Sequence, residues 1–390
     1  MRVSKGGAST VPKQGTSLPV PFLMTVRELD HGGIERDLTK IALKIDRSRF
    51  EPHVASYRAE GMRFEELRDA GVPVLELPIS SLASRQAVFA AFSMARYVRR
   101  HRIRLVHAYD ASGVFTVPLA RVLRVPAVLS SVVGSRDLLD PRTRRQLRLT
   151  DRLVDAIVVN CEAMRRHLIE DESVPAGRIE LCYNGVDTTQ FYPAQALRPK
   201  ALANASLVIG TVCVLRPEKA LDVLQEAFAR MRHVQPGTVL LIVGSGPELP
   251  RLEDNARRLG IAETSVFVPA TRDVPGFLRA IDIFVLCSHS EAFSNALLEA
   301  MACGCASIGT RVGGTPELIG DDERGLLCRP GDPADLAEKL TTLVRDAGLR
   351  RRFGTVAARF AKENLSIDVA VQRTSEIYEG LLRRKTGVVA

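Results

Sequence analysis

The sequence predicts an α/β protein made of two doubly wound domains that face a central cleft. Short β-rich runs alternate with helical patterns through most of the chain, which is typical of βαβ units with parallel strands. The chain has 390 residues, too many for one ordinary core, and fits two domains of about 150–200 residues each. With 46% hydrophobic and 25% charged residues, the composition is that of a globular protein.

In the first half of the chain, six apolar runs separated by helical segments predict a Rossmann-like domain over residues 21–195. The expected strands cover residues 22–26, 53–57, 74–77, 105–108, 127–132 and 156–159. Two of the intervening helices are expected at 33–45 and 89–101. Residues 1–20 lack the apolar segment of a signal peptide and are expected to form a disordered tail.

A turn-rich stretch at residues 194–205 is the predicted linker, and a second domain is expected over residues 206–366. Its predicted strands cover residues 207–214, 239–243, 266–268, 283–286 and 306–310. An amphipathic helix is expected at 367–384, within a last segment of residues 367–390. Two such domains would line one crevice with the carboxyl ends of both sheets, where α/β proteins bind ligands.

The positive charge of the chain is concentrated in its first part. Residues 1–150 carry 25 Lys and Arg against 14 Asp and Glu, whereas residues 151–390 carry 29 against 31. The basic stretches 96–104 and 142–152 predict either solvated helix faces or contact with an anionic membrane surface or an acidic acceptor. Nucleic acid is disfavoured as a partner, because these stretches lack interleaved aromatic residues and no DNA-binding motif is present.

The cysteines favour a reducing, cytoplasmic location. There are seven, an odd number, with no CxxC pair, and Cys303 and Cys305 are interpreted as small core residues rather than metal ligands. No run approaches the roughly 18 apolar residues of a membrane-spanning helix. A peripheral position on the inner face of the cytoplasmic membrane is compatible with both observations.

Two carboxylates stand on either side of a predicted strand-to-helix junction. Glu291 is expected in the loop after the apolar run 281–287, and Glu299 about two turns into the next helix, so both face one cleft. Between them lie the free backbone N–H groups of a helix N-terminus, those of Ser294, Asn295, Ala296 and Leu297. Such donors suit a phosphate and carboxylates suit hydroxyl groups, which together describe a sugar nucleotide. The alternative is an ordinary helix with Glu299 on a solvated face.

This segment resembles the E-x7-E signature of the retaining family 4 glycosyltransferases, which adopt the GT-B fold. The resemblance is densest from residue 266 to 318, where a GGTPE word completes it, and weaker over most of residues 20–385. It implies that Glu299 holds the donor ribose, that Glu291 binds hydroxyls of the transferred sugar, and that Phe293 lies in the donor site. It also implies that the last helix packs back on the N-terminal domain.

Arg216 and Lys219 follow the first strand of the second domain, where cations neutralise a departing diphosphate. The segment that contains them, residues 213–220, resembles the family motif G-R-L-x-P-E-K-G. The arginine of that motif falls on Val214 and its last glycine on Ala220, so Lys219 corresponds directly and Arg216 only by a shifted route.

Two further segments resemble donor-binding elements of the family. Gly244 and Gly246 end a strand in a G-x-G-P word that lies near the nucleotide in relatives. Thr271 and Arg272 belong to a loop placed where the family holds the base, largely through backbone groups. The base itself therefore leaves little trace in the sequence.

In the N-terminal domain, Gly32 and Gly33 open a helix where backbone can approach a ligand closely, and they resemble the GG-x-E start of the family. His107, Tyr109 and Asp110 resemble its H-x-H-[DE] word, with tyrosine at the second histidine. His107 is then a candidate acid or base, and a satisfied structural histidine is the alternative. Tyr109 and Asp110 are candidates for binding acceptor or donor hydroxyls.

Together these features predict a retaining glycosyltransferase that moves a sugar from a nucleotide-diphosphate sugar to a carbohydrate or lipid-linked acceptor, in polysaccharide or glycolipid biosynthesis. No metal or bound cofactor is expected, because Lys, Arg and helix dipoles can replace a divalent ion at the diphosphate. The alternatives are an epimerase or phosphorylase of the same fold, and a catalytically silent sugar-nucleotide-binding partner. A dehydrogenase is disfavoured, since no G-x-G-x-x-G follows the first strand. The sugar, the base, the acceptor and the oligomeric state are not specified by the sequence.

Overall fold

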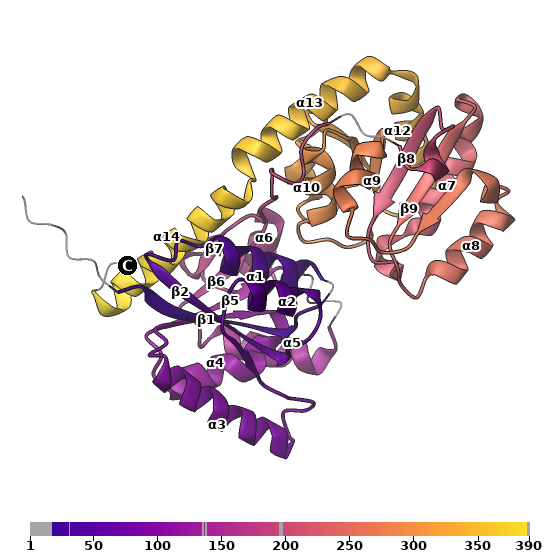
Figure 1. Cartoon of the computed structure of the whole chain (residues 1–390). Coiled ribbons are helices and arrows are strands. Elements are labelled where there is room, and N and C mark those ends of the chain that lie inside the picture. Colours follow the sequence, from indigo (N-terminus) through magenta and orange to yellow (C-terminus); the bar gives the residue numbers. More distant parts are fainter. Residues whose placement is uncertain (1–17, 31, 135, 137–138, 195–197, 388–390) are drawn as a thin grey trace, which may run out of the picture.

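The structure is a computed structural model, and it describes residues 18–30, 32–134, 136, 139–194 and 198–387. It contains two parallel sheets, each covered by helices (Figure 1). The first sheet has the strand order β3-β2-β1-β4-β5-β6-β7, and the second has the order β10-β9-β8-β11-β12-β13. In both sheets the order reverses beside the first strand of the domain, which is where doubly wound folds bind ligands. The predicted fold class is confirmed.

The first sheet contains every strand predicted for it and one more. Its strands are β1 Val20–Glu28, β2 Phe50–Arg58, β3 Val74–Glu76, β4 Leu105–Tyr109, β5 Ala127–Val132, β6 Ala156–Val159 and β7 Ile179–Leu181. Its helices are α1 Gly33–Lys44, α2 Met62–Asp69, α3 Arg85–Arg100, α4 Gly113–Val122, α5 Pro141–Asp151 and α6 Glu162–Glu170. The short edge strand β7 was not predicted. The helix expected from residue 89 begins earlier, at Arg85, because Ser84 caps it by accepting the N–H of Ala87.

The second sheet also contains its predicted strands, together with β13, which was not predicted. Its strands are β8 Leu207–Val212, β9 Thr238–Val243, β10 Ser265–Val268, β11 Ile283–Leu286, β12 Ala306–Thr310 and β13 Gly325–Cys328. Its helices are α7 Leu221–Met231, α8 Leu249–Arg258, α9 Val274–Ala280, α10 Asn295–Ala302, α11 Thr315–Ile319, α12 Pro333–Arg345 and α13 Ala347–Asn364. Of the expected linker, residues 195–197 lie outside the described residues, and Lys200–Leu202 forms a 3-10 turn whose Leu202 is buried.

Helices bury both faces of the first sheet. Helices α1 and α2 pack with Phe22, Phe50 and Leu105 on one face, while α3, α4 and α6 pack with Leu23 and Val106 on the other. Strands β4, β5 and β6 are buried along their whole length, as expected for parallel strands covered on both sides.

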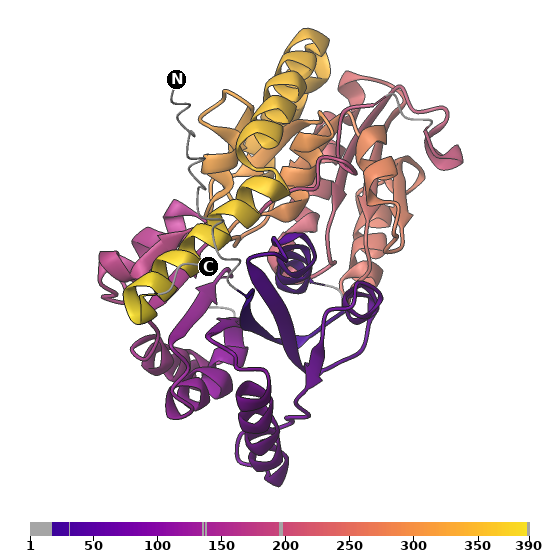
Figure 2. The same ribbon diagram turned by 60° about the vertical axis from the view of Figure 1, so that its left-hand side comes forward.

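The last helix, α14 Ile367–Thr386, leaves the second domain and runs back along the first (Figures 1 and 2). It joins α1 and α2 on their face of the sheet, and the Tyr378 ring lies 5.2 Å from that of Phe22 and 5.9 Å from that of Phe50. Where the chain crosses between domains, Val186 and Ser366 form an isolated parallel bridge. A Cβ atom at Gly185 would approach the Cα of Ile367 to 2.6 Å, so glycine allows the two crossing segments to touch.

Within the described residues, no helix combines the length and the apolar character needed to cross a membrane. The same part of the chain contains no group of three or more His, Cys, Asp or Glu side chains arranged to hold a metal ion.

Candidate active site

Helix α10 begins at the carboxyl edge of the second sheet and carries the second glutamate. Ser294 caps it, because its hydroxyl accepts the N–H of Leu297 at 3.3 Å. The N–H groups of Asn295 and Ala296 lie in the first turn, where a helix has no internal acceptors for them. Glu299 lies just over one turn into α10, one turn earlier than expected, and is only 2% exposed. The alternative of a solvated helix face for Glu299 is therefore wrong.

Glu291 and Lys219 meet at the carboxyl edge of the second sheet. The ammonium nitrogen of Lys219 lies 2.5 Å from Oε1 of Glu291, and the Ser288 hydroxyl donates to the same oxygen at 2.8 Å. Burial alone would lower the pKa of Lys219, but the Glu291 carboxylate outweighs it and raises that pKa. Lys219 therefore stays charged beside Glu291. The side chains are 21% and 11% exposed, so a ligand can still reach the pair.

The loop that carries Glu291 is fixed by a later glycine turn. Gly313 has a φ of 50°, and a Cβ atom there would lie 1.8 Å from the carbonyl oxygen of Glu291. The N–H of Gly314 donates to the carbonyl of Ala292 at 2.6 Å. The GGTPE motif thus positions Glu291 through backbone contacts, and these contacts require glycine at positions 313 and 314.

The other predicted donor residues lie around the same edge. A Cβ at Gly244 would come within 1.8 Å of the Cys213 carbonyl oxygen, and one at Gly246 within 2.3 Å of the Leu215 carbonyl oxygen. These glycines therefore let two loops of the chain pack together, a structural requirement that exists without any ligand. The Ser245 hydroxyl accepts the N–H of Ala270 at 3.0 Å and ties the turn to the loop of Thr271 and Arg272.

Ala220 stands where the family pattern has glycine. Ala220 has a φ of 49°, in the left-handed region that favours glycine, so the family glycine at this place has a backbone reason. Arg216 is exposed in the preceding loop. Phe293, which follows Glu291 in the same loop, is buried, and its ring lies 5.3 Å from that of Tyr183.

Across the cleft, the first turns of α1 meet the start of α10. Gly33 lies where a Cβ atom would be 3.5 Å from Nδ2 of Asn295. That amide donates to both carboxylate oxygens of Asp37, at 2.9 and 3.1 Å. One turn further along α10, the Arg36 guanidinium lies 2.8 Å from Oε1 of Glu299. The Gly32–Gly33 turn therefore lies beside the start of α10.

Two acidic residues that follow strands of the first sheet, Glu35 and Asp110, have raised pKa values. Burial raises the pKa of Glu35, whose side chain folds back over Gly32, and the carboxylates of Glu28 and Asp110 raise it further. Burial also raises the pKa of Asp110, which lies at the carboxyl end of β4 with a φ of 49°. A left-handed backbone at a residue other than glycine is strained and is common at functional sites. Asp110 thus keeps its place among the candidate residues.

His107 and Tyr109 lie inside the first domain instead of at its surface. Both ring nitrogens of His107 are engaged at 2.7 Å, Nδ1 with the Tyr378 hydroxyl and Nε2 with the Ser131 hydroxyl. Burial lowers the pKa of His107 to about 3, so the ring is neutral. The structure contradicts its predicted role as an acid or base and agrees with the structural alternative. Tyr109, 4% exposed and stacked 4.4 Å from His107, is likewise corrected from a hydroxyl-binding residue to a core residue.

The reason for this correction is α14, which covers the carboxyl end of β4. Together with α1 and the first sheet it encloses a cavity of about 40 Å³ lined by His107 and Tyr109, with room for a few water molecules. A sequence pattern near residue 107 carries no sign of a partner at residue 378.

Two protein-family models match the sequence, and together they cover most of its length. Residues 195–360 match the model described as Glycosyl transferases group 1, and residues 31–190 match the model described as Glycosyltransferase Family 4. The chain belongs to the family 4 glycosyltransferases.

Two curated relatives of this family 4 glycosyltransferase show how far the similarity extends. N-acetyl-alpha-D-glucosaminyl L-malate synthase of Bacillus anthracis is 30% identical over 212 residues, which cover 54% of this chain and 55% of that protein. D-inositol 3-phosphate glycosyltransferase of Stackebrandtia nassauensis is 33% identical over 233 residues, 55% and 53% of the two chains. The matched part of the chain spans about half the length of each of these relatives.

Solved structures support the GT-B fold of this family 4 glycosyltransferase. A glycosyltransferase from Rickettsia africae has a TM-score of 0.82 at 20% identity, covering 94% of this chain and 99% of its own. The Anabaena protein HepE, solved in complex with UDP, has a TM-score of 0.79 at 21% identity, covering 93% and 100%. Likeness at this identity establishes the fold and not the substrate.

Sequence reasoning missed several residues that join the two domains of this glycosyltransferase. Besides Arg36 and Asp37, Glu317 of the GGTPE word accepts the N–H groups of Glu162 and Ala163 at 2.9 and 3.0 Å, capping α6 of the other domain. The only sequence signal was position, since Arg36 and Asp37 lie one turn after Gly33.

The buried, neutral state of His107 leads to a pH prediction. A histidine with a folded pKa of about 3 and an unfolded pKa of about 6.5 binds more protons when unfolded between these values. Its contribution to stability is therefore complete above about pH 6.5 and is lost as the pH falls toward 3. We expect the wild type to lose about 2 kcal/mol more than His107→Gln between about pH 7 and pH 5, measured by urea unfolding. Parallel pH profiles for the two proteins would contradict this assignment.

Proposed function

We propose that the protein is a retaining glycosyltransferase that transfers a sugar from a nucleotide-diphosphate sugar to an acceptor hydroxyl. The observation that supports this most strongly is the meeting of Lys219, Glu291 and the N-terminus of α10 at the carboxyl edge of the second sheet. A cation and free N–H donors suit a diphosphate, and the adjacent carboxylates suit sugar hydroxyls.

Each group has a separate role in the proposed reaction. The bond between the anomeric carbon and the phosphate oxygen breaks, and its electron pair leaves with the nucleoside diphosphate. Lys219 and the N–H groups of Asn295 and Ala296 stabilise that growing negative charge. Glu291 accepts hydrogen bonds from hydroxyls of the transferred sugar, and Glu299 accepts those of the ribose. The acceptor oxygen bonds the same carbon, and its proton passes to the departing phosphate oxygen. Retention of configuration is carried over from the family resemblance.

The donor and acceptor classes rest on different support. The Anabaena protein was solved with UDP and with UDP-glucose, which favours a nucleotide-sugar donor for this chain as well. The acceptor is proposed to be a carbohydrate or a lipid-linked molecule, in cytoplasmic polysaccharide or glycolipid synthesis, because the acceptor-side domain is strongly basic.

A thermal-shift screen against uridine, guanosine and adenosine diphosphate sugars tests the donor site. A donor at about 100 times its Kd is expected to stabilise the fold by about 2.7 kcal/mol, which is a shift of several degrees in Tm. Glu299→Ala should weaken that donor about 10- to 100-fold, since hydrogen bonds to a buried carboxylate are lost. Glu363→Ala, on the exposed side of α13, is the matched control and should leave the shift unchanged.

Product analysis with a labelled donor then separates the alternatives. Label on an added acceptor supports the transferase. Label that changes only within the nucleotide sugar indicates an epimerase, and a thermal shift without any turnover indicates a silent binding partner. Absence of a shift with every donor class would overturn the proposed site itself.

A further inference from the structure

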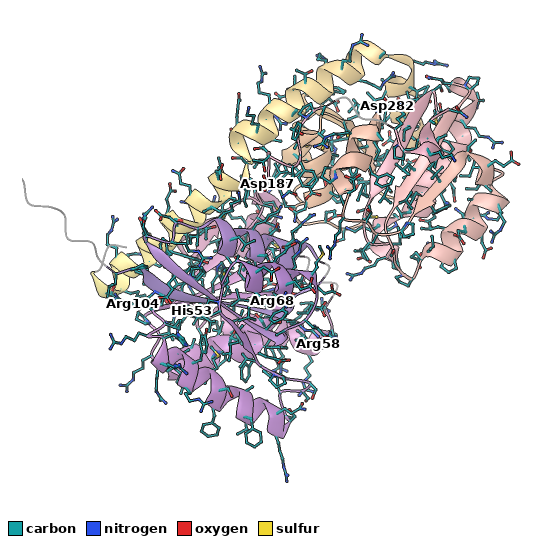
Figure 3. The ribbon with its side chains drawn as sticks, in the orientation of Figure 1. His53, Arg58, Arg68, Arg104, Asp187 and Asp282 are labelled. Carbon is teal, nitrogen blue, oxygen red and sulfur yellow. The ribbon has the colours of Figure 1, made fainter. Side chains whose placement is uncertain are left out.

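Helix α3 exposes a row of large apolar side chains on the first domain. Its inner face buries Ala90, Met94 and Val98 against the first sheet. On the opposite face, Val88 is 56%, Phe89 71% and Phe92 72% exposed. Spacings of three and four residues place these three side chains on one stripe of the helix. Figures 1 and 3 show α3 along the lower side of the first domain, remote from the second.

Such a stripe is unusual for the surface of a soluble domain. Phenylalanine is among the residues most often buried, and single exposed apolar residues need no explanation, whereas adjacent ones mark an interaction surface. Leu82, 44% exposed in the loop before α3, extends the same apolar region.

The charges around the stripe are of one sign. Residues 77–109 contain six arginines and no aspartate or glutamate. Four of the arginines lie on the same side of α3 as the apolar stripe and are exposed, namely Arg85, Arg96, Arg99 and Arg100. Among the described residues, none of these four takes part in an ion pair. The face is therefore an apolar stripe set in uncompensated positive charge.

We propose that this face of α3 docks on the surface of an anionic lipid bilayer. Phenylalanine and valine on one stripe, with arginines beside them, match the composition of helices that lie in the membrane interface. Anionic headgroups would neutralise the arginines while the phenyl rings enter the acyl boundary. A second copy of the chain fits less well, because pairing two such faces would bring at least eight like charges together.

The position of the stripe along the helix gives the docked protein an orientation. Strand β3 ends at the carboxyl edge of the first sheet, and α3 must run back to the amino edge, where β4 begins. Arg58, which ends β2, and Arg104, which precedes β4, lie at opposite sides of the domain (Figure 3) and mark these two edges. The apolar half of α3 therefore lies toward the carboxyl edge, which faces the cleft, and the Arg96–Arg100 half lies away from it.

This inference goes beyond the proposed transfer reaction and does not depend on it. Vesicle binding can be measured without donor or acceptor. The test uses the full chain with vesicles of phosphatidylcholine containing phosphatidylglycerol, and with vesicles of phosphatidylcholine alone. The wild type is expected to bind the anionic vesicles, to bind the neutral ones at least about tenfold more weakly, and to be released by added salt.

Two sets of variants test the stripe and the charges separately. Phe89→Ser with Phe92→Ser should weaken binding to anionic vesicles about tenfold or more. The matched control, Ile169→Ser with Val369→Ser, changes two exposed apolar residues elsewhere and should bind as the wild type does.

The charge variant replaces Arg96, Arg99 and Arg100 with glutamine and should weaken binding about tenfold or more and reduce its salt dependence. Its control, with glutamine at Arg345, Arg351 and Arg359, removes three exposed arginines from the second domain and the same net charge.

Three results of these experiments would contradict docking of α3 on a membrane. The proposal is overturned if the wild type does not bind the anionic vesicles. It is also overturned if the phenylalanine variant binds them as strongly as its control variant does. Sedimentation that shows a wild-type dimer, converted to a monomer by the phenylalanine variant without a change in vesicle binding, would assign the face to self-association instead. All substituted side chains are exposed, so circular dichroism and urea unfolding should show folded variants throughout.

Discussion

Lys219→Ala is expected to lower the rate of sugar transfer about 10²- to 10³-fold. Removing a fixed cation from a developing negative charge has an effect of this size in sites that stabilise charge by preorganised groups. The lysine lies 2.5 Å from Glu291 at the donor edge, and the raised pKa keeps it charged. The measurement is kcat with saturating donor, once the donor class is known.

The same substitution separates catalysis from folding. Loss of Lys219 removes the cation beside the Glu291 carboxylate and should reduce the free energy of unfolding by about 1–3 kcal/mol. Lys339→Ala on α12 removes another partly buried lysine that lies near carboxylates, and should leave kcat unchanged. The double variant Lys219→Ala with Glu291→Gln should be less impaired than the product of the single effects, because the two residues act together. Full turnover by Lys219→Ala would remove this site from consideration.

Tyr378→Ala is expected to reduce the free energy of unfolding by about 3–5 kcal/mol, as large core truncations do. The ring is completely buried between Phe22 and Phe50, and its hydroxyl is bonded to His107. Tyr378→Phe keeps the ring and should lose only about 1–2 kcal/mol, the hydrogen bond with its buried partner. Urea unfolding provides the measurement.

Tyr192→Ala supplies the surface comparison, since that side chain is 46% exposed, and should lose less than about 1 kcal/mol. If Tyr378→Ala cost no more than Tyr192→Ala, α14 would not be an integral part of the first domain. A large difference would make the last helix a structural element of the first domain, whose other residues in this core cluster lie between positions 20 and 182.

The donor side of the site was predictable because its geometry is local to one sheet. Lys219 and Glu291 follow β8 and β11, which are neighbours in the second sheet, so a βαβ pattern alone brings their loops to one edge. Strands β7 and β13 escaped prediction for a related reason. They have three and four residues, and such short segments carry too little alternation to separate them from loops.

The residues that were missed or corrected depend on contacts between distant parts of the chain. His107 is a core residue because Tyr378 covers it, and the two are 271 positions apart. Arg36 and Asp37 acquire their partners only through the relative position of the two domains. Hydrophobic periodicity and motif spacing describe one segment at a time, so neither could indicate these contacts.

The bridge between Val186 and Ser366 has a mechanical consequence. The chain passes between the domains twice, and both passages are held together there, since Val186 donates its N–H to the Leu365 carbonyl at 2.9 Å and accepts that of Ile367 at 2.8 Å. Domain movement that bends one passage must bend the other at the same place. The two passages therefore define a single hinge axis, and the two domains separate most at the cleft residues farthest from it.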